Sequence, residues 1–322
     1  MRAVTQERYG VPSEVLRLRD IPAPEVGAGE VLVRVAASPV SGTDWHLVLG
    51  LPYAARFVVG LRKPSNPVFG LEFAGTVTAV GAGVHDVQVG DEVFGWHGGT
   101  FAEYISVPAE QLTHKPRNLS AAHAAAVPIA SFTALQAVRD LGKVTAGQEV
   151  LISGASGCVG TYAVQIAKAL GARVTGICGA DKADLVRSLG AERVVDHREQ
   201  RLPDIGERFD VLVDIYGNPS LRECGAVLRP GGTLVFVGGT GGRLFMGTDR
   251  WLRGLIAAPF LRFDVRALVH EDRRDDLVTM REFIESGAVT PVVGQLYELD
   301  RVAEAIEDVR AGKVRGQAVV TI

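Results

Sequence analysis

The residues with the clearest chemical meaning form a glycine-rich turn. An apolar strand pattern over 150–153 leads into the sequence Gly-Ala-Ser-Gly-Cys-Val-Gly at 154–160, and residues 161–170 follow with helical spacing. Glycines at such a turn let the backbone approach a pyrophosphate closely, and the amides at the start of the helix attract negative charge. A glycine-rich connection without a ligand would share these letters, but a strand, a turn, a helix and a second strand in this order favour dinucleotide binding.

The end of the second strand of this segment indicates which dinucleotide is bound. An NAD-selective site usually has Asp or Glu there, which holds the ribose 2'-hydroxyl. Here the strand ends in Ile177-Cys178-Gly179, and Lys182 follows. Lysine would neutralise a 2'-phosphate, although Asp181 is its neighbour in sequence and Lys182 could also be a solvated residue in the first turn of a helix. We expect NADPH as the cofactor, with Gly179 and Lys182 at its adenosine end and Cys178 in packing.

A doubly wound parallel sheet is expected to position this turn. Residues 148 to about 239 alternate apolar strands, glycine turns and helices, which is typical of a parallel sheet covered on both faces. We expect a helix in each gap between strands. The strands are predicted over residues 149–153, 173–177, 193–195, 211–214 and 233–237.

The chain before this sheet has a different pattern. Residues 1 to about 120 contain short apolar strands separated by glycine and proline, which indicates an antiparallel, barrel-like lobe. Alternation is clearest at 30–36, 75–80 and 92–94, and Gly90-Asp91 is a hairpin signal. The tail predicts a helix at 272–286, a strand at 295–299, a helix at 301–311 and a strand at 317–322. This tail could return to complete the first lobe.

Composition narrows the class of protein. The 322 residues suggest two lobes, and the 47% hydrophobic and 22% charged residues are ordinary globular usage. A formal charge of -3 without a basic stripe makes nucleic acid an unexpected partner. The first eight residues lack a signal-peptide core, and no apolar run approaches the roughly 20 residues of a membrane span. Three widely spaced cysteines suit a reducing compartment, so we expect a cytoplasmic protein that does not bind membranes.

Several motifs together resemble the medium-chain dehydrogenase/reductase superfamily, specifically its zinc-independent quinone oxidoreductase-like branch. They are GLEFAGTV from Gly70, GDEVFG from Gly90, the segment 124–138, which resembles the family's interlobe helix, the glycine turn, VVDH from Val194, residues 210–217 and VRGQAVV from Val314. The resemblance covers nearly the whole chain. It implies an α/β protein in which a GroES-like β-barrel domain (1–125 and 264–322) flanks a Rossmann domain (126–263), with a substrate cleft between the domains and commonly a homodimer.

The resemblance also implies roles for particular residues of the cofactor site. Thr133 would lie near the nicotinamide, Val237 and Gly238 would line its pocket, and Lys182 and His197 would surround the adenosine phosphate. His197 departs from the usual tyrosine, but an imidazole can still donate to a phosphate. Four residues of the glycine turn are expected to contact the pyrophosphate, namely Ser156, Gly157, Cys158 and Val159. Tyr216 and Arg315 are expected to bind the cofactor as well.

Zinc-bearing members of the superfamily use ligands that this chain lacks. Ser41 stands where a cysteine is expected, Leu71 replaces a histidine, and Ala130 or Ser131 stands near the place of the remaining cysteine. Residues 94–125 contain no cysteine, so the structural-zinc lobe is missing too. His97 and His114 are interpreted as exposed loop histidines. We predict no metal.

Without a metal, catalysis must depend on placing the nicotinamide near an electron-poor carbon and excluding water. Quinones and α,β-unsaturated carbonyls accept hydride with little help, so the predicted function is an NADPH-dependent, zinc-independent reductase of one of these. Candidate groups for the substrate oxygen are Ser41, Asp44, Trp45 and Tyr53, with Thr133. Equally, Tyr53 could only pack in a loop and Asp44 could cap the following helix. Gly42 stands where some enoyl reductases have a tyrosine acid.

Two alternatives remain open from the sequence. One is an alcohol dehydrogenase or ketone reductase of the same superfamily, and the other is a non-catalytic NADPH-binding redox sensor. Specificity is expected to depend on the loops 47–67 and 241–260, where Trp251 could wall the cleft or enter a dimer contact. The apolar stretch 255–261 also suggests a homodimer.

Overall fold

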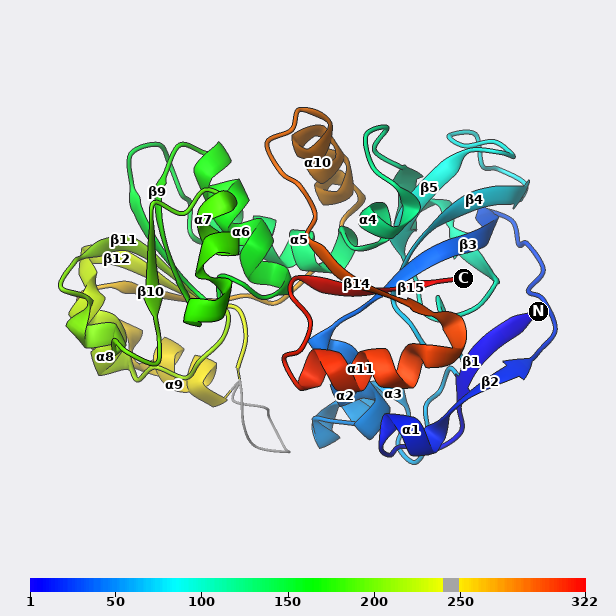
Figure 1. Cartoon of the computed structure of the whole chain (residues 1–322), viewed down its shortest axis with the longest axis horizontal. Helices are drawn as coiled ribbons and strands as arrows, with labels where there is room; N and C mark the ends of the chain where they lie inside the picture. The colour runs from blue at the N-terminus through cyan, green and yellow to red at the C-terminus, as the bar shows by residue number, and fades with distance from the viewer. Residues whose placement is uncertain (240–248) are drawn as a thin grey trace. The chain divides into compact units, whose positions relative to one another are not determined.

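The computed structural model describes residues 1–239 and 249–322, without the side chains of Val58 and Asp249. The chain divides into two compact units (Figure 1). The first unit comprises residues 1–129, 272–287 and 291–322, and the second comprises residues 130–271 and 288–290. Both chain ends therefore belong to the first unit. The domain limits expected from the sequence, 126 and 263, stay a prediction.

The second unit contains a six-stranded parallel sheet in the order β10-β9-β8-β11-β12-β13. The strands are β8 (Glu149–Ser153), β9 (Arg173–Cys178), β10 (Arg193–Asp196), β11 (Phe209–Asp214), β12 (Leu228–Phe236) and β13 (Asp264–Ala267). This confirms the doubly wound sheet and its five predicted strands, and β13 is a sixth that the prediction missed. The order reverses beside β8, and ligands of such sheets bind at the carboxyl ends of the strands at this point.

Helices cover both faces of this sheet. Figure 1 shows α6 (Cys158–Ala169) and α7 (Ala183–Ser188) on one side, and α8 (Leu221–Val227) and α9 (Asp249–Ala257) on the other. The prediction of a helix in every gap was wrong between β10 and β11, where only the 3-10 turn η5 (Leu202–Ile205) forms. Pro203 is in the first turn, where proline is tolerated, and Gly206 ends the turn in a left-handed conformation after four residues.

The first unit is built on a seven-stranded sheet in the order β14-β15-β3-β4-β5-β7, with β6 also paired to β3. A separate ribbon pairs β1 with β2. The strands are β1 (Arg2–Gln6), β2 (Leu16–Asp20), β3 (Glu30–Val40), β4 (Glu72–Val80), β5 (Glu92–Trp96), β6 (Tyr104–Pro108), β7 (Leu112–His114), β14 (Val293–Glu298) and β15 (Gln317–Thr321). Because β15 pairs antiparallel with the end of β3, the tail does complete the first lobe.

The helices of the first unit are α1 (Pro12–Val15), α2 (Gly42–Leu49), α3 (Arg56–Val59), α4 (Ala121–Ala125), α10 (Arg274–Glu285) and α11 (Val302–Arg310). The single helix expected at 124–138 is instead divided. Helix α5 (Pro128–Leu135) starts after α4 has ended, and a π-helical turn (Gln136–Leu141) continues it. Proline is favoured at the first position of a helix, where its missing N–H costs nothing, so Pro128 sets this boundary.

Each unit has its own apolar core. In the first unit, β3 buries Val31, Val33 and Val35 while the intervening Arg34 is exposed, which is the alternation expected of a sheet with one buried face. A second cluster of that unit lies between α2, α11 and β15. In the second unit Leu151, Leu212 and other residues of the parallel strands pack against α8 and η5. Among the described residues, no helix is long and apolar enough to cross a membrane.

Candidate functional site

The glycine turn connects β8 to α6 in the second unit. Gly154 has a φ of +75°, and a Cβ there would lie 2.7 Å from the Cβ of Tyr216. A Cβ on Gly160 would lie 2.1 Å from the carbonyl oxygen of Gly154. Larger residues at these two positions would force the backbone apart. The glycines therefore let the chain turn sharply and let α6 pack directly on the end of β8.

The start of α6 is suited to a diphosphate. Its N-cap, Gly157, provides no side-chain hydrogen bond, and the first turn contains no acidic residue. Residues 156–159 are accessible, whereas Ala155 and Gly160 on either side are buried. A helix N-terminus of this kind binds anions through its amides and its dipole. The predicted pyrophosphate residues are thus brought together on one accessible turn.

A basic group surrounds the end of β9, where the adenosine end of a dinucleotide is expected. A Cβ on Gly179 would lie 2.7 Å from a carboxylate oxygen of Asp181 and 3.5 Å from the guanidinium of Arg198. Arg198 and Asp181 are 3.8 Å apart, and both are exposed. Lys182, at the end of the 3-10 turn Ala180–Lys182, is half-buried. Arg198 was not predicted, although it directly follows His197, the last residue of the motif VVDH.

Asp196 connects the two loops of this region. Its carboxylate accepts hydrogen bonds from the N–H of Ala180 (3.2 Å) and from the N–H of Arg198 (2.9 Å). The half-exposed ring of His197 lies with its Nδ1 3.5 Å from the same carboxylate. The loops after β9 and β10 are therefore held together, with His197 and Arg198 at the start of the loop after β10. Cys178 is buried, which raises the pKa of its thiol and agrees with a packing role.

The residues predicted for the nicotinamide lie on α5 and at the end of β12. The hydroxyl of Thr133 is 3.2 Å from Nδ1 of His270, whose ring stacks on Phe132. The N–H groups of Val237 and Gly238 both donate to the carbonyl of Asp214, at 3.0 and 3.3 Å. His270 was missed by the sequence analysis because it is 137 residues from Thr133 and belongs to no motif.

Ser41 and Asp44 form one cluster in the first unit. The N–H and the hydroxyl of Ser41 donate to one oxygen of Asp44, at 2.6 and 3.0 Å. The other oxygen, Oδ1, is buried without a hydrogen-bond partner. Burial raises the pKa of Asp44 to about 6, and the bonds from Ser41 oppose this shift. Asp44 therefore does hold the start of α2, but half of its carboxyl group is not used in that role.

Glu72 is a second buried carboxyl group in the first unit. It is 4% exposed, and its Oε2 accepts a hydrogen bond from the N–H of Ile129 at 2.8 Å. Ile129 is in the first turn of α5, so Glu72 caps this helix from β4. The pKa of Glu72 is raised to about 8, mainly by burial and also by the negative charges of Asp44 and Asp272, while the bond from Ile129 opposes this shift. Glu72 is part of the motif GLEFAGTV, but no role was predicted for it.

The remaining candidates have arginine neighbours. The guanidinium of Arg56 lies 4.9 Å from the ring centre of Tyr53, which is 42% exposed. Arg310 lies 3.8 Å from the ring of Trp45. Arg315 is exposed, just before β15 in the first unit. Of the expected specificity loop 241–260, residues 241–248 lie outside the described residues.

The positions that correspond to zinc ligands hold none of the usual donors. Leu71 is apolar and Ser131 is fully buried. His97 is half-buried and 2.8 Å from Gln111, and His114 lies at the end of β7, so neither is simply an exposed loop histidine as expected. Within residues 1–239 and 249–322, no group of three His, Cys, Asp or Glu side chains could hold a metal ion. The absence of a metal stays a prediction.

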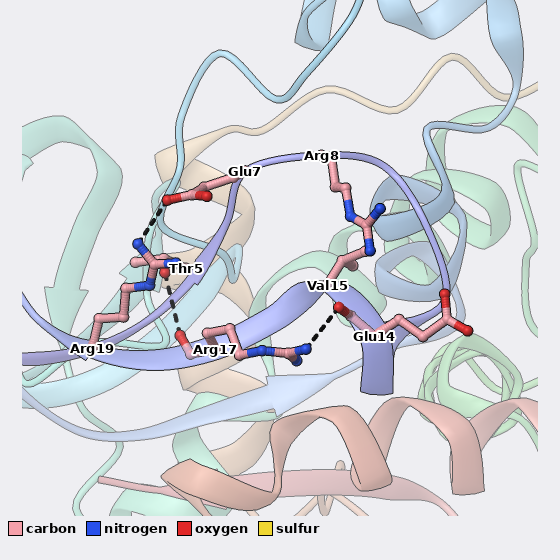
Figure 2. A pocket seen from close by; sticks show the side chains of 7 residues that line it. All are labelled: Thr5, Glu7, Arg8, Glu14, Val15, Arg17 and Arg19. Carbon is pink, nitrogen blue, oxygen red and sulfur yellow. Dashed lines mark hydrogen bonds and ion pairs between the residues drawn. The ribbon is translucent and has the colours of Figure 1, made fainter.

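A charged pocket lies elsewhere in the first unit, between β1, α1 and β2. Its volume is about 310 Å³, and Figure 2 shows its lining residues. Arg19 pairs with Glu7 at 2.6 Å, and Arg17 donates to backbone carbonyls, including that of Glu14. Arg17 and Arg19 thus have their hydrogen-bond partners within the segment from β1 to β2, and both side chains are exposed to solvent. The pocket therefore offers no better site than the glycine turn.

Comparisons with known proteins agree with this architecture. Residues 27–117 match the family described as alcohol dehydrogenase GroES-like domain, and residues 189–320 match the family described as zinc-binding dehydrogenase. The fold and the glycine turn therefore define the class as a Rossmann protein with a GroES-like unit.

Individual relatives narrow this class. The chain is 32% identical to human quinone oxidoreductase over 97% of its own length and 94% of the relative's. It is 28% identical to 2-methylene-furan-3-one reductase of Solanum lycopersicum, over 99% of this chain and 79% of that protein. The solved quinone oxidoreductase of Coxiella burnetii superimposes with a TM-score of 0.87 at 26% identity, covering 100% of this chain and 99% of that one. The chain belongs to the medium-chain dehydrogenase/reductase superfamily, in its quinone oxidoreductase-like branch, and is an oxidoreductase.

Proposed function

We propose that this protein is an NADPH-dependent, zinc-independent reductase of quinones or of α,β-unsaturated carbonyl compounds. The observation that carries the proposal is the accessible glycine turn at the start of α6, at the carboxyl end of a parallel sheet. Relatives named as a quinone oxidoreductase and as a reductase of a conjugated furanone support the substrate class.

The cofactor, when bound, supplies a hydride to the electron-poor carbon of the substrate. The residues of the chain bind and orient the reactants and move one proton. Residues 156–159 hold the pyrophosphate, and Thr133, Tyr216, Val237 and Gly238 orient the nicotinamide end. The Ser41 hydroxyl donates to the ionised Asp44. Asp44 has a pKa raised to about 6, so in weakly acidic solution it is protonated; its O–H then donates to Oγ of Ser41, which frees the Ser41 hydrogen for the substrate oxygen. As the proton of Ser41 moves to the substrate, Ser41 takes the proton of Asp44.

Several charges support the preference for NADPH over NADH. The end of β9 has Gly179 where an acid would hold a 2'-hydroxyl, and Lys182, His197 and Arg198 lie in the adjoining loops. We propose that these three side chains neutralise the 2'-phosphate, and Arg315 stays a candidate cofactor residue on the family resemblance alone. Asp181 opposes this, and its ion pair with Arg198 must open when the phosphate binds.

Independence of zinc is supported by the chemistry of the side chains. Leu71 cannot ligate a metal, and Glu72 is engaged with the start of α5. An alcohol dehydrogenase of the same superfamily would need a Lewis acid to polarise its substrate. Metal analysis of the purified protein separates the two functions, since bound zinc that is essential for turnover would favour the alcohol dehydrogenase.

We also propose a homodimer formed through β13. This strand pairs with β12 at the edge of the second unit's sheet, and edge strands offer unpaired backbone groups. Exposed apolar side chains lie on α9 and just after it, in the segment that leads into β13, namely Leu252, Leu255, Ile256 and Phe260. Sedimentation should give twice the mass of one chain, and Ile256→Glu should produce monomers. Three free cysteines suit a reducing compartment, and we propose the cytoplasm.

The test is NADPH oxidation with a small quinone and with a conjugated enone, each in the presence of a chelator. Turnover that resists the chelator and is faster with NADPH than with NADH is expected. Tight binding of NADPH without turnover of any acceptor would instead favour the non-catalytic redox sensor. No binding of either dinucleotide would refute the proposal.

A further inference from the structure

A nearly buried ion pair connects α9 to the end of β11. Asp214 has a side chain that is 1% exposed, and Arg250, in the first turn of α9, is 16% exposed. One nitrogen of Arg250 donates to Asp214 at 2.9 Å. The guanidinium also lies 4.8 Å from the ring centre of Phe236, the last residue of β12. Such a pair is costly to desolvate, so it is retained only where its geometry is closely satisfied.

The same arginine holds the loop that follows β11. It donates to the side-chain oxygen of Asn218 at 3.1 Å and to the carbonyl of Pro219 at 2.8 Å. Next to it on α9, the indole N–H of Trp251 donates to the carbonyl of Gly238 at 3.4 Å. The first turn of α9 is thus fastened to the loops after both β11 and β12.

This network continues to the glycine turn. The hydroxyl of Ser153, the last residue of β8, donates to the carbonyl of Tyr216. The carbonyl of Asp214 accepts the N–H groups of Val237 and Gly238. Asp214 Oδ1 has no hydrogen-bond partner and lies 3.9 Å from the position that a Cβ on Gly217 would take. Asp214 therefore holds the loop after β12 through its backbone carbonyl and α9 through its carboxyl group, directly before the loop that contains Tyr216.

We infer that Arg250, acting through Asp214, is a positioning residue for the nicotinamide end of the cofactor. The inference rests on the proposed function. Arg250 sets the place of Tyr216 and Gly238 by holding their loops, and we assign it no contact with the substrate. Trp251 assists by holding Gly238.

The test compares Arg250→Met, Arg250→Lys, Asp214→Asn and the double variant Arg250→Met/Asp214→Asn. Arg222, exposed on α8 of the same unit, provides the control Arg222→Met. The dissociation constant of NADPH is measured by quenching of protein fluorescence, together with the melting temperature, KM and kcat. The first readout needs no turnover.

Arg250→Met is expected to raise the dissociation constant and the KM for NADPH at least tenfold, with kcat within threefold of the wild type. Arg250→Lys should recover part of the loss, and the double variant should bind no more weakly than Arg250→Met, because it leaves no unpaired carboxylate. Unchanged NADPH binding in Arg250→Met would overturn the inference, even with a lower melting temperature. If that variant does not fold, an unchanged dissociation constant in both Arg250→Lys and Asp214→Asn does the same. Failure of the wild type to bind NADPH would refute the proposed function itself, whereas binding without turnover still permits this test.

Discussion

Glu72 should make the first unit less stable as the pH rises, and Glu72→Gln should remove this dependence. The pKa of Glu72 is about 8 in the folded protein, against an ordinary value of 4.5. A carboxyl group with a raised folded pKa binds its proton more tightly in the folded state. Its stabilising contribution is therefore complete below pH 4.5 and is lost progressively as the pH rises through 8.

The magnitude follows from the width of this window. Within it, the free energy of unfolding falls by about 1.4 kcal/mol per pH unit for one group. Between pH 5 and pH 7 the loss is about 3 kcal/mol, and burial of Glu72 leaves little solvent screening to reduce it. Glutamine keeps the carbonyl that accepts the N–H of Ile129 but does not titrate. Glu72→Gln should therefore gain about 3 kcal/mol on the wild type between the two pH values.

Urea unfolding measures this difference, followed by the fluorescence of Trp45 and Trp96, which both belong to the first unit. Glu25→Gln, at an exposed position, is the matched control and should follow the wild type. Parallel stability profiles for Glu72→Gln and the wild type from pH 5 to pH 7 would refute the reasoning. They would show that Glu72 is ionised and compensated in the folded protein.

Three further predictions concern the site. Gly160→Ala places a Cβ 2.1 Å from a backbone oxygen, so the dissociation constant of NADPH, measured by fluorescence titration, should rise at least tenfold. Wild-type affinity would show that the turn accommodates the Cβ without losing its shape. Lys182→Ala and Arg198→Ala should each raise the KM for NADPH about tenfold and leave the KM for NADH unchanged, because each removes one charge-assisted contact to the 2'-phosphate. Equal effects on both cofactors would contradict a 2'-phosphate site. The proposed transfer of a proton from Asp44 through Ser41 predicts that kcat falls as the pH rises through about 6. Asp44→Asn should abolish this fall and Ser41→Ala should lower kcat at least tenfold, and a wild-type pH profile in Asp44→Asn would exclude the relay.

Much of the fold could be predicted because local patterns specify it. The strands of the second unit are apolar runs bounded by glycine, and the turn at 154–160 marks the sheet's first helix. Strand β13 was missed because Asp264 and Arg266 interrupt its apolar pattern. The interlobe segment was expected as one helix, but α5 starts at Pro128, and Glu72 from a strand distant in the sequence accepts the N–H of Ile129 in its first turn.

The candidate site was less predictable than the fold because it depends on contacts between distant residues. Gly179, Lys182 and His197 could be chosen from motifs, but the approach of Arg198 to Gly179 requires two loops to be joined by Asp196. Thr133 contacts His270, which is 137 positions further along the chain. Asp214 likewise binds Arg250, 36 positions further along. The unpartnered oxygen of Asp44 follows from burial, which no motif reports.

The central claim is that the protein moves hydride from NADPH to an activated acceptor without a metal. The most direct measurement uses NADPH deuterated at the transferable position, a conjugated enone and a chelator, with the product analysed by mass spectrometry. The account predicts a reduced product that carries the deuterium on the carbon β to the carbonyl. A product without the label, or no product unless zinc is restored, would contradict it.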